Sequence, residues 1–102
     1  MQIALRCDSF DAAEALRLGL VNRVVPEAEL RAQTLALAQR LAAGPTLAYG
    51  QLKRLLRQSF DNDLATQLDA GREAFSACRL TRDFEEGVEA FLSKRPAVFE
   101  GR

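Results

Sequence analysis

Apolar residues recur at spacings of three and four along most of this chain, which is the period of an amphipathic helix. The clearest example is residues 81–95. Its apolar stripe consists of Phe84, Val88, Phe91 and Leu92. Thr81 is a candidate N-cap, and Asp83, Glu85 and Glu86 follow in the first turns, where the helix dipole favours acids. Pro96 should end this helix before a tail that carries Phe99 and Gly101.

Earlier segments carry weaker versions of the same signals. Residues 1–5 are apolar and uncapped, which is typical of the end of a helix. Residues 10–19 begin with Asp11 and Glu14 in a capping-box arrangement and end at Gly19, which suits the left-handed position after a helix. Residues 20–25 are rich in valine and stop at Pro26, which predicts a short extended segment.

Three more helices are predicted between Pro26 and Arg79. Pro26 and Pro45 suit the first turns of two of them, and Gly44 separates the two. Residues 61–63 form a turn with capping aspartates before the third. The apolar faces predicted for the three helices are Leu30, Thr34, Leu37, Ala38 and Leu41; Ala48, Leu52, Leu55, Leu56 and Phe60; and Leu64, Leu68, Gly71, Phe75 and Cys78.

The fold class that follows is all-α, with about four to six helices in a single helical domain over residues 1–102. The loops are short, so neighbouring helices should pack roughly antiparallel. The sequence is rich in Ala and Leu and poor in β-branched residues, which favours helix over sheet. A chain of 102 residues is long enough for one small core.

Charge and hydropathy exclude several classes of protein. The net charge is zero, which argues against a nucleic-acid partner. No apolar run is long enough to cross a membrane, and no signal peptide precedes the helices, so we expect a cytoplasmic protein without a membrane partner. Cys7 and Cys78 lie far apart without metal-ligand spacing and are predicted to be free thiols.

Few residues offer catalytic chemistry. The chain contains no histidine, the commonest general base and metal ligand, so we expect no catalytic residue and no metal site. Glu85 and Glu86 could be a carboxylate pair, but adjacent helical residues point about 100° apart, and surface acids are the simpler interpretation. Cys78 lies on an apolar stripe, which favours a buried and inert thiol over a nucleophile.

Two groups of residues could bind a ligand, and each also has a purely structural interpretation. Lys53, Arg54 and Arg57 form a basic patch that is either a solvated face or an anion contact. Phe75 and Phe91 either pack in the core or, with Lys94 and Arg95 at the helix exit, hold a flat ring beside a phosphate.

Three stretches together resemble the enoyl-CoA hydratase/isomerase (crotonase) family. They are AAEALRLGLVNRVVP at residues 12–26, AAGPTLAYGQLKRLL at 42–56 and DFEEGVEAFLSKRPAVFEGR at 83–102. The resemblance covers the whole chain, which is similar to the C-terminal helical region of the family. Among family members, the sequence most resembles bacterial isomerases of the phenylacetate pathway.

The resemblance implies a region that covers the acyl-CoA site and builds a trimer or hexamer. Phe75, Phe91 and Lys94 match family positions at the adenine-nucleotide end of coenzyme A, partly across a subunit boundary. The implied substrate is a coenzyme A thioester from fatty-acid or aromatic-acid degradation, and no separate cofactor is expected.

The family's catalytic glutamates and oxyanion-hole amides belong to a spiral β/α core that the sequence does not show. Because the oxyanion hole is usually the largest catalytic term, this chain is expected to be inactive by itself and is interpreted as a fragment, a truncated reading frame or a separately made domain. Residues 6–8, Arg-Cys-Asp, depart from the family's usual glycine-containing turn. The alternative function is a stand-alone, non-catalytic helical interaction module derived from the family. Whether the parent enzyme is a hydratase or an isomerase, and which acyl chain it accepts, stay open.

Overall fold

The computed structural model describes Leu5 and residues 8–102 and divides the chain into two compact units, residues 1–35 and 36–102. The described residues form helices and connecting segments without strands, which confirms the all-α prediction. The division falls inside α3 (Glu27–Ala42). The single-domain assignment stays a prediction. The predicted helix end at residues 1–5 lies outside the described residues apart from Leu5.

In the first unit, α2 (Ala12–Arg17) has the ends that its sequence predicts. The Asp11 carboxylate accepts a hydrogen bond from the Glu14 amide at 2.8 Å, which satisfies one free N–H of the first turn. The Glu14 side chain turns instead to Arg17, so only half of the predicted capping box forms. Gly19 adopts φ +72° and closes the helix, and residues 21–25 then run without helix or strand.

Helix α3 begins directly after Pro26, whose missing N–H costs nothing in a first turn. Arg23 donates to the Gln33 side chain at 3.1 Å, and Gln33 donates to Glu29 at 2.8 Å. These contacts tie the extended segment to the first half of the helix. Leu30, Leu37 and Leu41 of the predicted apolar face are all about half exposed in this chain.

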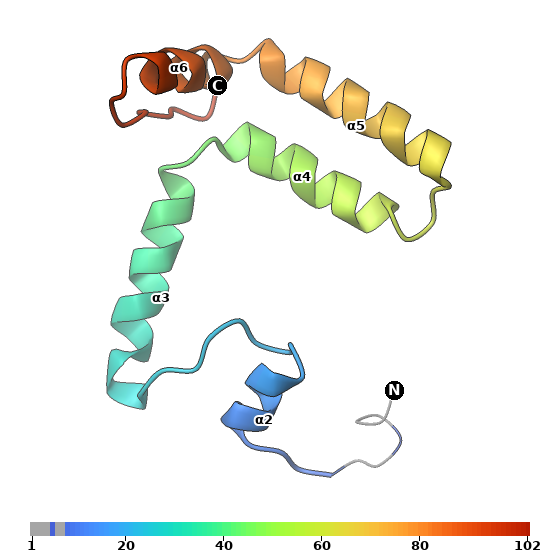
Figure 1. Ribbon diagram of the computed structural model, residues 1–102. Helices are drawn as coiled ribbons and strands as arrows, with labels where there is room; N and C mark the ends of the chain where they lie inside the picture. The colour runs from blue at the N-terminus through green and yellow to red at the C-terminus, as the bar shows by residue number, and fades with distance from the viewer. Residues whose placement is uncertain (1–4, 6–7) are drawn as a thin grey trace. The chain divides into compact units, whose positions relative to one another are not determined.

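In the second unit, α4 (Thr46–Gln58) and α5 (Leu64–Arg79) form an antiparallel hairpin (Figure 1). Asp63 caps α5 by accepting from the Thr66 amide at 2.7 Å, as the sequence predicts. The turn is also held by Gln67, which donates to the Leu55 carbonyl at 3.1 Å and accepts from Asn62 at 3.0 Å. Phe60 lies beyond the end of α4 and is 90% exposed, so it does not extend that helix's apolar face.

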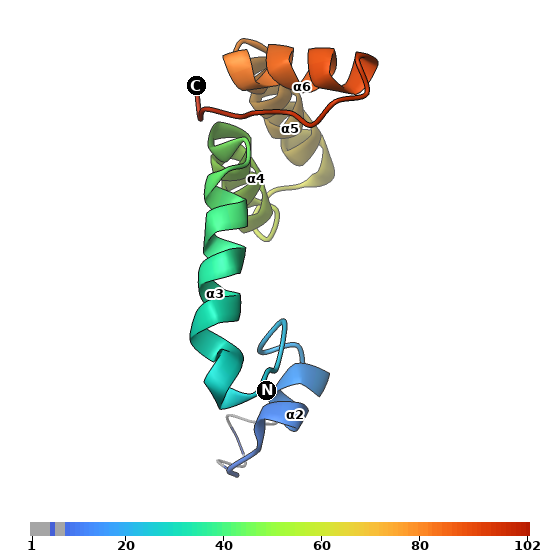
Figure 2. The same ribbon diagram turned by 90° about the vertical axis from the view of Figure 1, so that its left-hand side faces the viewer.

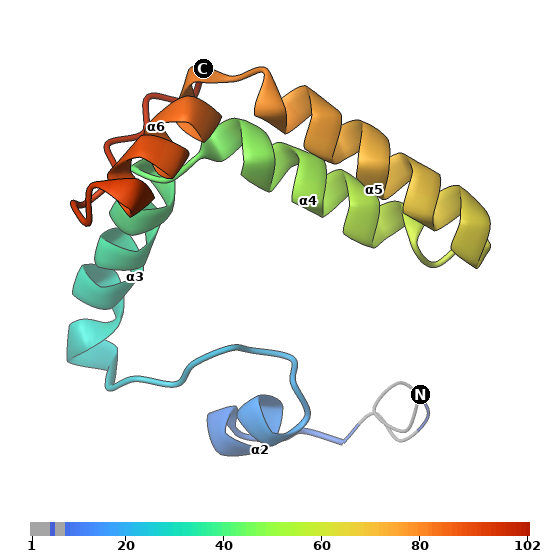
Figure 3. The same ribbon diagram turned by 45° about the horizontal axis from the view of Figure 1, so that its top comes forward.

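Helix α6 (Arg82–Leu92) follows after one short connection, with Thr81 as its predicted N-cap. The rings of Phe75 on α5 and Phe84 on α6 meet edge to face with centroids 5.9 Å apart, which fixes α6 against the hairpin. The tail from Arg95 to Arg102 runs back along α6 (Figure 2). Helix and tail lie at the end of the hairpin where α4 begins and α5 stops (Figure 3).

Very little of this chain is buried. Ala74 and Ala90 are the buried apolar side chains of the described residues, and Asp83 is the buried charged one. Most large apolar side chains on every helix are more than a third exposed. The length-based expectation of a core is therefore met only in part: the described residues bury Ala74 of α5 and Ala90 of α6, while the most extensive helix contact is between α4 and α5. No helix in the described part of the chain is long and apolar enough to span a membrane.

Candidate functional site

The exit of α6 is a left-handed turn centred on Lys94. Ser93 is the C-cap, and Lys94 has φ +53°, a conformation that favours glycine. The Arg95 amide donates to the Ala90 carbonyl at 3.0 Å and the Lys94 amide donates to Phe91 at 3.2 Å, which is the hydrogen-bond pattern of a Schellman motif. The helix thus ends at Leu92, earlier than the predicted stop at Pro96, because this turn closes it first.

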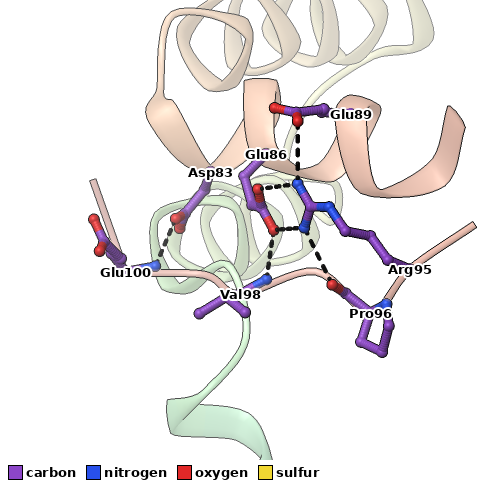
Figure 4. Close-up of polar contacts among 7 residues, drawn as sticks. All are labelled: Asp83, Glu86, Glu89, Arg95, Pro96, Val98 and Glu100. Atoms are coloured by element: carbon purple, nitrogen blue, oxygen red, sulfur yellow. Dashed lines mark hydrogen bonds and ion pairs between the residues drawn. The ribbon is translucent and has the colours of Figure 1, made fainter. Parts of the chain in front are cut away.

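Two carboxylates of α6 bind the returning tail, and we call them the tail clamp (Figure 4). The first is Glu86, which accepts from both ends of the Arg95 guanidinium at 2.6 and 2.9 Å and from the Val98 amide at 2.7 Å. The Arg95 hydrogen bonds and then the Val98 amide lower the pKa of Glu86 to about 2. The hydrogen bonds to Glu86, together with the charges of Glu86 and Glu89, raise the pKa of Arg95.

The second carboxylate of the tail clamp is Asp83, which is only 5% exposed. It accepts from the Glu100 amide at 2.7 Å and from the Gly101 amide at 3.0 Å, and its own amide donates to the Arg102 carbonyl at 2.9 Å. A buried carboxylate is costly unless it is hydrogen-bonded, and here backbone amides of the tail are its partners. The prediction that Asp83 is a dipole-complementing acid is incomplete, because its side chain is a buried acceptor for the tail.

Gly101 lets the tail approach the start of α4. Its φ is +75°, and an added Cβ would lie 2.7 Å from the Thr46 hydroxyl oxygen. Any other residue at this position would therefore combine backbone strain with a steric contact. The glycine allows the last residues to pass close to α4.

Helix α6, the tail and the start of α4 line an apolar cleft of about 420 Å³ that is open to solvent. Phe91, Leu92 and Val88 line it from α6, and Phe99 lines it from the tail. An added Cβ at Gly87 would contact the Phe99 ring at 3.6 Å, so the ring passes directly over the helix backbone. The tail clamp thereby sets one wall of the cleft.

The structure separates the three predicted site residues. Phe91 lines the cleft and is 82% exposed, whereas Phe75 lies on α5, is 61% exposed and is not among the lining residues. Lys94 is exposed at the helix exit, and within the described residues its side chain has no ion pair. Phe91 and Lys94 are thus neighbours at the end of α6, while Phe75 contacts Phe84. Their role in coenzyme A binding stays a prediction.

Three sequence-based interpretations of this region need correction. Val88 and Leu92 of the apolar stripe were expected to pack in a core, yet both are exposed in this chain. Glu86 is a tail contact rather than a solvated surface acid, although it does not pair with Glu85. Cys78 is half-buried and lines the cleft, so it is less enclosed than predicted, while Cys7 lies outside the described residues.

Among the described residues, the cleft offers aromatic and aliphatic contacts, the exposed Lys94 follows at the exit of α6, and no acid–base pair is positioned there. Glu85 and Glu89 line a separate polar groove with both clamp carboxylates. Within the described residues, no cluster of His, Cys, Asp or Glu has the arrangement of a metal site. The described residues thus place an exposed aromatic ring, an apolar cleft and a cation without an ion pair at the end of α6.

The described residues define an all-helical region with an exposed apolar cleft, and comparison with known proteins gives its family. The family model of enoyl-CoA hydratase/isomerase matches residues 1–102. A probable enoyl-CoA hydratase of Rhodobacter capsulatus is 36% identical over 102 residues, which is all of this chain and 40% of that protein. The 1,2-epoxyphenylacetyl-CoA isomerase of Escherichia coli is 34% identical over 102 residues, again all of this chain and 39% of that protein.

A solved structure agrees in fold. The enoyl-CoA hydratase of Geobacillus kaustophilus superposes with a TM-score of 0.87 at 32% identity, over 94% of this chain and 36% of that one. The chain belongs to the enoyl-CoA hydratase/isomerase family. It spans about two-fifths of the length of the curated relatives that it matches.

Proposed function

We propose that this chain is the C-terminal region of an enoyl-CoA hydratase/isomerase, where it covers the coenzyme A end of an acyl-CoA thioester and joins subunits. The thioester is a substrate from fatty-acid or aromatic-acid degradation in the cytoplasm, and no separate cofactor takes part. The observation that carries the proposal is the exposed Phe91 ring, beside a cleft and three residues before the cation of Lys94.

The chemistry of the nucleotide end of coenzyme A matches these two residues. Adenine is a flat ring that stacks on aromatic side chains, and the adjacent phosphates attract a cation. The left-handed turn at Lys94 sets where its side chain leaves the helix, and the tail clamp holds the residues that follow. Phe75 is exposed on a different surface, and we assign it to the adenine side of a site completed by a neighbouring subunit.

Assembly would also cover the apolar faces that this chain leaves open. Leu52 and Leu56 on α4 and Leu68 on α5 are all more than half exposed. Apolar surface of this extent usually marks a partner interface. We therefore expect the purified chain to self-associate, and a monomer by light scattering at high concentration would contradict the assembly part of the proposal.

Binding of coenzyme A to the purified chain tests the nucleotide assignment. In a calorimetric titration we expect weak affinity that falls about fivefold or more for Phe91→Ala, because one stacked base contributes roughly 1–3 kcal/mol. Lys94→Ala should weaken binding of coenzyme A more than binding of adenosine, which lacks phosphate. Phe60→Ala and Arg40→Ala are matched controls, since both side chains are exposed away from the cleft. Unchanged affinity in Phe91→Ala and Lys94→Ala would refute the assignment.

Turnover of crotonyl-CoA tests a different part of the proposal. The described residues around the cleft include no positioned acid–base pair, and we expect the 102-residue chain to show no hydration of crotonyl-CoA above background. Enzyme-dependent hydration would show that this chain supplies catalytic residues and would contradict this part of the proposal. Coenzyme A binding without turnover would favour the covering role over the interaction-module alternative.

A further inference from the structure

One face of α4 carries a group of cations that the proposed function does not use. Its residues recur at helical spacings of three and four and line an open cavity of about 450 Å³; they are Gly50, Lys53, Arg54, Arg57 and Gln58. We call this surface the α4 basic face. Gly50 has no side chain, and no atom lies within 4 Å of the position that a Cβ would take there. The surface beside Lys53 and Arg54 is therefore open at this residue.

The positive charge of this face is not neutralised within the described part of the chain. Helix α4 contains no acid, and none of its three cations takes part in an ion pair there. Four arginines elsewhere in the described residues differ in this respect. Carboxylates of the same chain pair with Arg17, Arg72, Arg95 and Arg102. Three like charges on adjacent turns repel one another, and an external anion would relieve that repulsion.

Arg54 is oriented without being neutralised. Its Nε and Nη2 atoms donate to the Gln51 side-chain oxygen at 3.1 and 2.9 Å, and Nη1 donates to the Gln58 oxygen at 3.3 Å. Amide oxygens carry no net charge, so the guanidinium keeps its full positive charge while its direction is fixed. A cation held in this way loses less side-chain entropy when an anion binds.

We propose that the α4 basic face binds a small phosphate-bearing anion with at least two negative charges. Arginine and lysine together are suited to phosphate, which accepts several charge-assisted hydrogen bonds. The cavity volume lies within the range of small-molecule sites, roughly 300–1,000 Å³. The surface is separate from the Phe91 cleft, which α4 lines through Leu47 and Ala48 in its first turn. The proposal therefore does not rest on coenzyme A binding at Lys94.

Titration of the 102-residue chain with inorganic pyrophosphate at low salt tests the proposal. We expect saturable binding that Lys53→Gln/Arg54→Gln/Arg57→Gln weakens at least tenfold. The control Arg31→Gln/Arg72→Gln/Arg79→Gln removes the same charge from exposed residues of α3 and α5 and should change the affinity less than threefold. Gln51→Ala should weaken binding by a smaller factor, because Arg54 loses its orienting partner. Circular dichroism confirms that each variant keeps its helices.

Further arms of the experiment identify the source of the phosphate. If a free phosphorylated metabolite is the ligand, pyrophosphate and adenosine 3′,5′-bisphosphate bind and the triple variant loses both. If a phosphate of coenzyme A is the ligand, the triple variant also weakens coenzyme A, whereas Phe91→Ala leaves pyrophosphate binding unchanged. No saturable binding of pyrophosphate, or an equal loss in the control triple variant, would overturn the proposal.

Discussion

Asp83→Ala should release the C-terminal tail from α6. In the folded chain the Asp83 carboxylate is 5% exposed and accepts hydrogen bonds from the amides of Glu100 and Gly101. Alanine removes both acceptors and leaves two N–H groups without partners unless the tail moves into water. Each unsatisfied group costs about 1–3 kcal/mol, so the docked tail should lose roughly 2–6 kcal/mol.

Hydrogen exchange at the tail amides measures this loss directly. A penalty of that size lowers the docking equilibrium about 30- to 20,000-fold, because 1.4 kcal/mol corresponds to a factor of ten. Amide exchange at Glu100 and Gly101 should accelerate by the same factor. The upper limit is the exchange rate of a fully undocked tail. Exchange in the middle of α5 should change little, since the tail clamp lies at one end of the hairpin.

Asp83→Asn separates geometry from charge. The asparagine oxygen can still accept from one amide, but its NH2 group is a donor that faces a second donor. We expect an acceleration between those of the wild type and Asp83→Ala. Asp69→Ala is the control, because this exposed residue pairs with Arg72 at 3.5 Å and such pairs contribute at most about 1 kcal/mol. Unchanged tail protection in Asp83→Ala would refute the clamp reasoning.

Three further predictions concern the tail, the exit of α6 and one glycine of α4. Gly101→Ala should destabilise tail docking by about 1–2 kcal/mol, because alanine at this φ is strained and its Cβ contacts Thr46. Gly50→Ala should instead raise the thermal midpoint, because the site is open and alanine has the higher helix propensity. Lys94→Gly should stabilise the isolated chain by about 1–2 kcal/mol in a denaturant titration, because glycine adopts positive φ without strain. Glu86 stabilises the tail fully above its unfolded pKa of 4.5, and this contribution should disappear as pH falls from 4.5 towards 2; tail exchange against pH should lose that step in Glu86→Gln.

Local signals in the sequence predict the helices and most of their ends. Asp11, Asp63 and Thr81 each cap the amide three residues ahead, and that geometry depends on a few adjacent residues only. Gly19 closes α2 for the same reason, because positive φ is a property of one residue. The all-α class follows from these signals together with the helical period of the apolar residues.

Longer-range roles could not be predicted in the same way. Asp83 contacts residues 17 and 18 positions later, and Gln67 contacts a carbonyl 12 positions earlier. In the sequence both look like ordinary polar residues of a helix. Periodicity likewise shows that Phe91 belongs to an apolar face, but it does not show what covers that face. The 82% exposure of Phe91 appears only in the folded chain.

Within the described residues, α2 also ends in a Schellman motif, in which the Leu20 amide donates to Ala15 and the Gly19 amide donates to Leu16, and it differs from the motif after α6 in one informative way. After α2 the left-handed position is Gly19, which adopts φ +72° without strain, but after α6 the same position is Lys94 at φ +53°. A non-glycine residue there costs about 1–2 kcal/mol, and nothing in the described part of the chain pairs with the ammonium group to offset it. Stability alone would favour glycine at both positions. A strained cation beside an exposed aromatic ring is therefore better explained by a contact made with another molecule, and Lys94→Gly should raise stability while it lowers coenzyme A affinity.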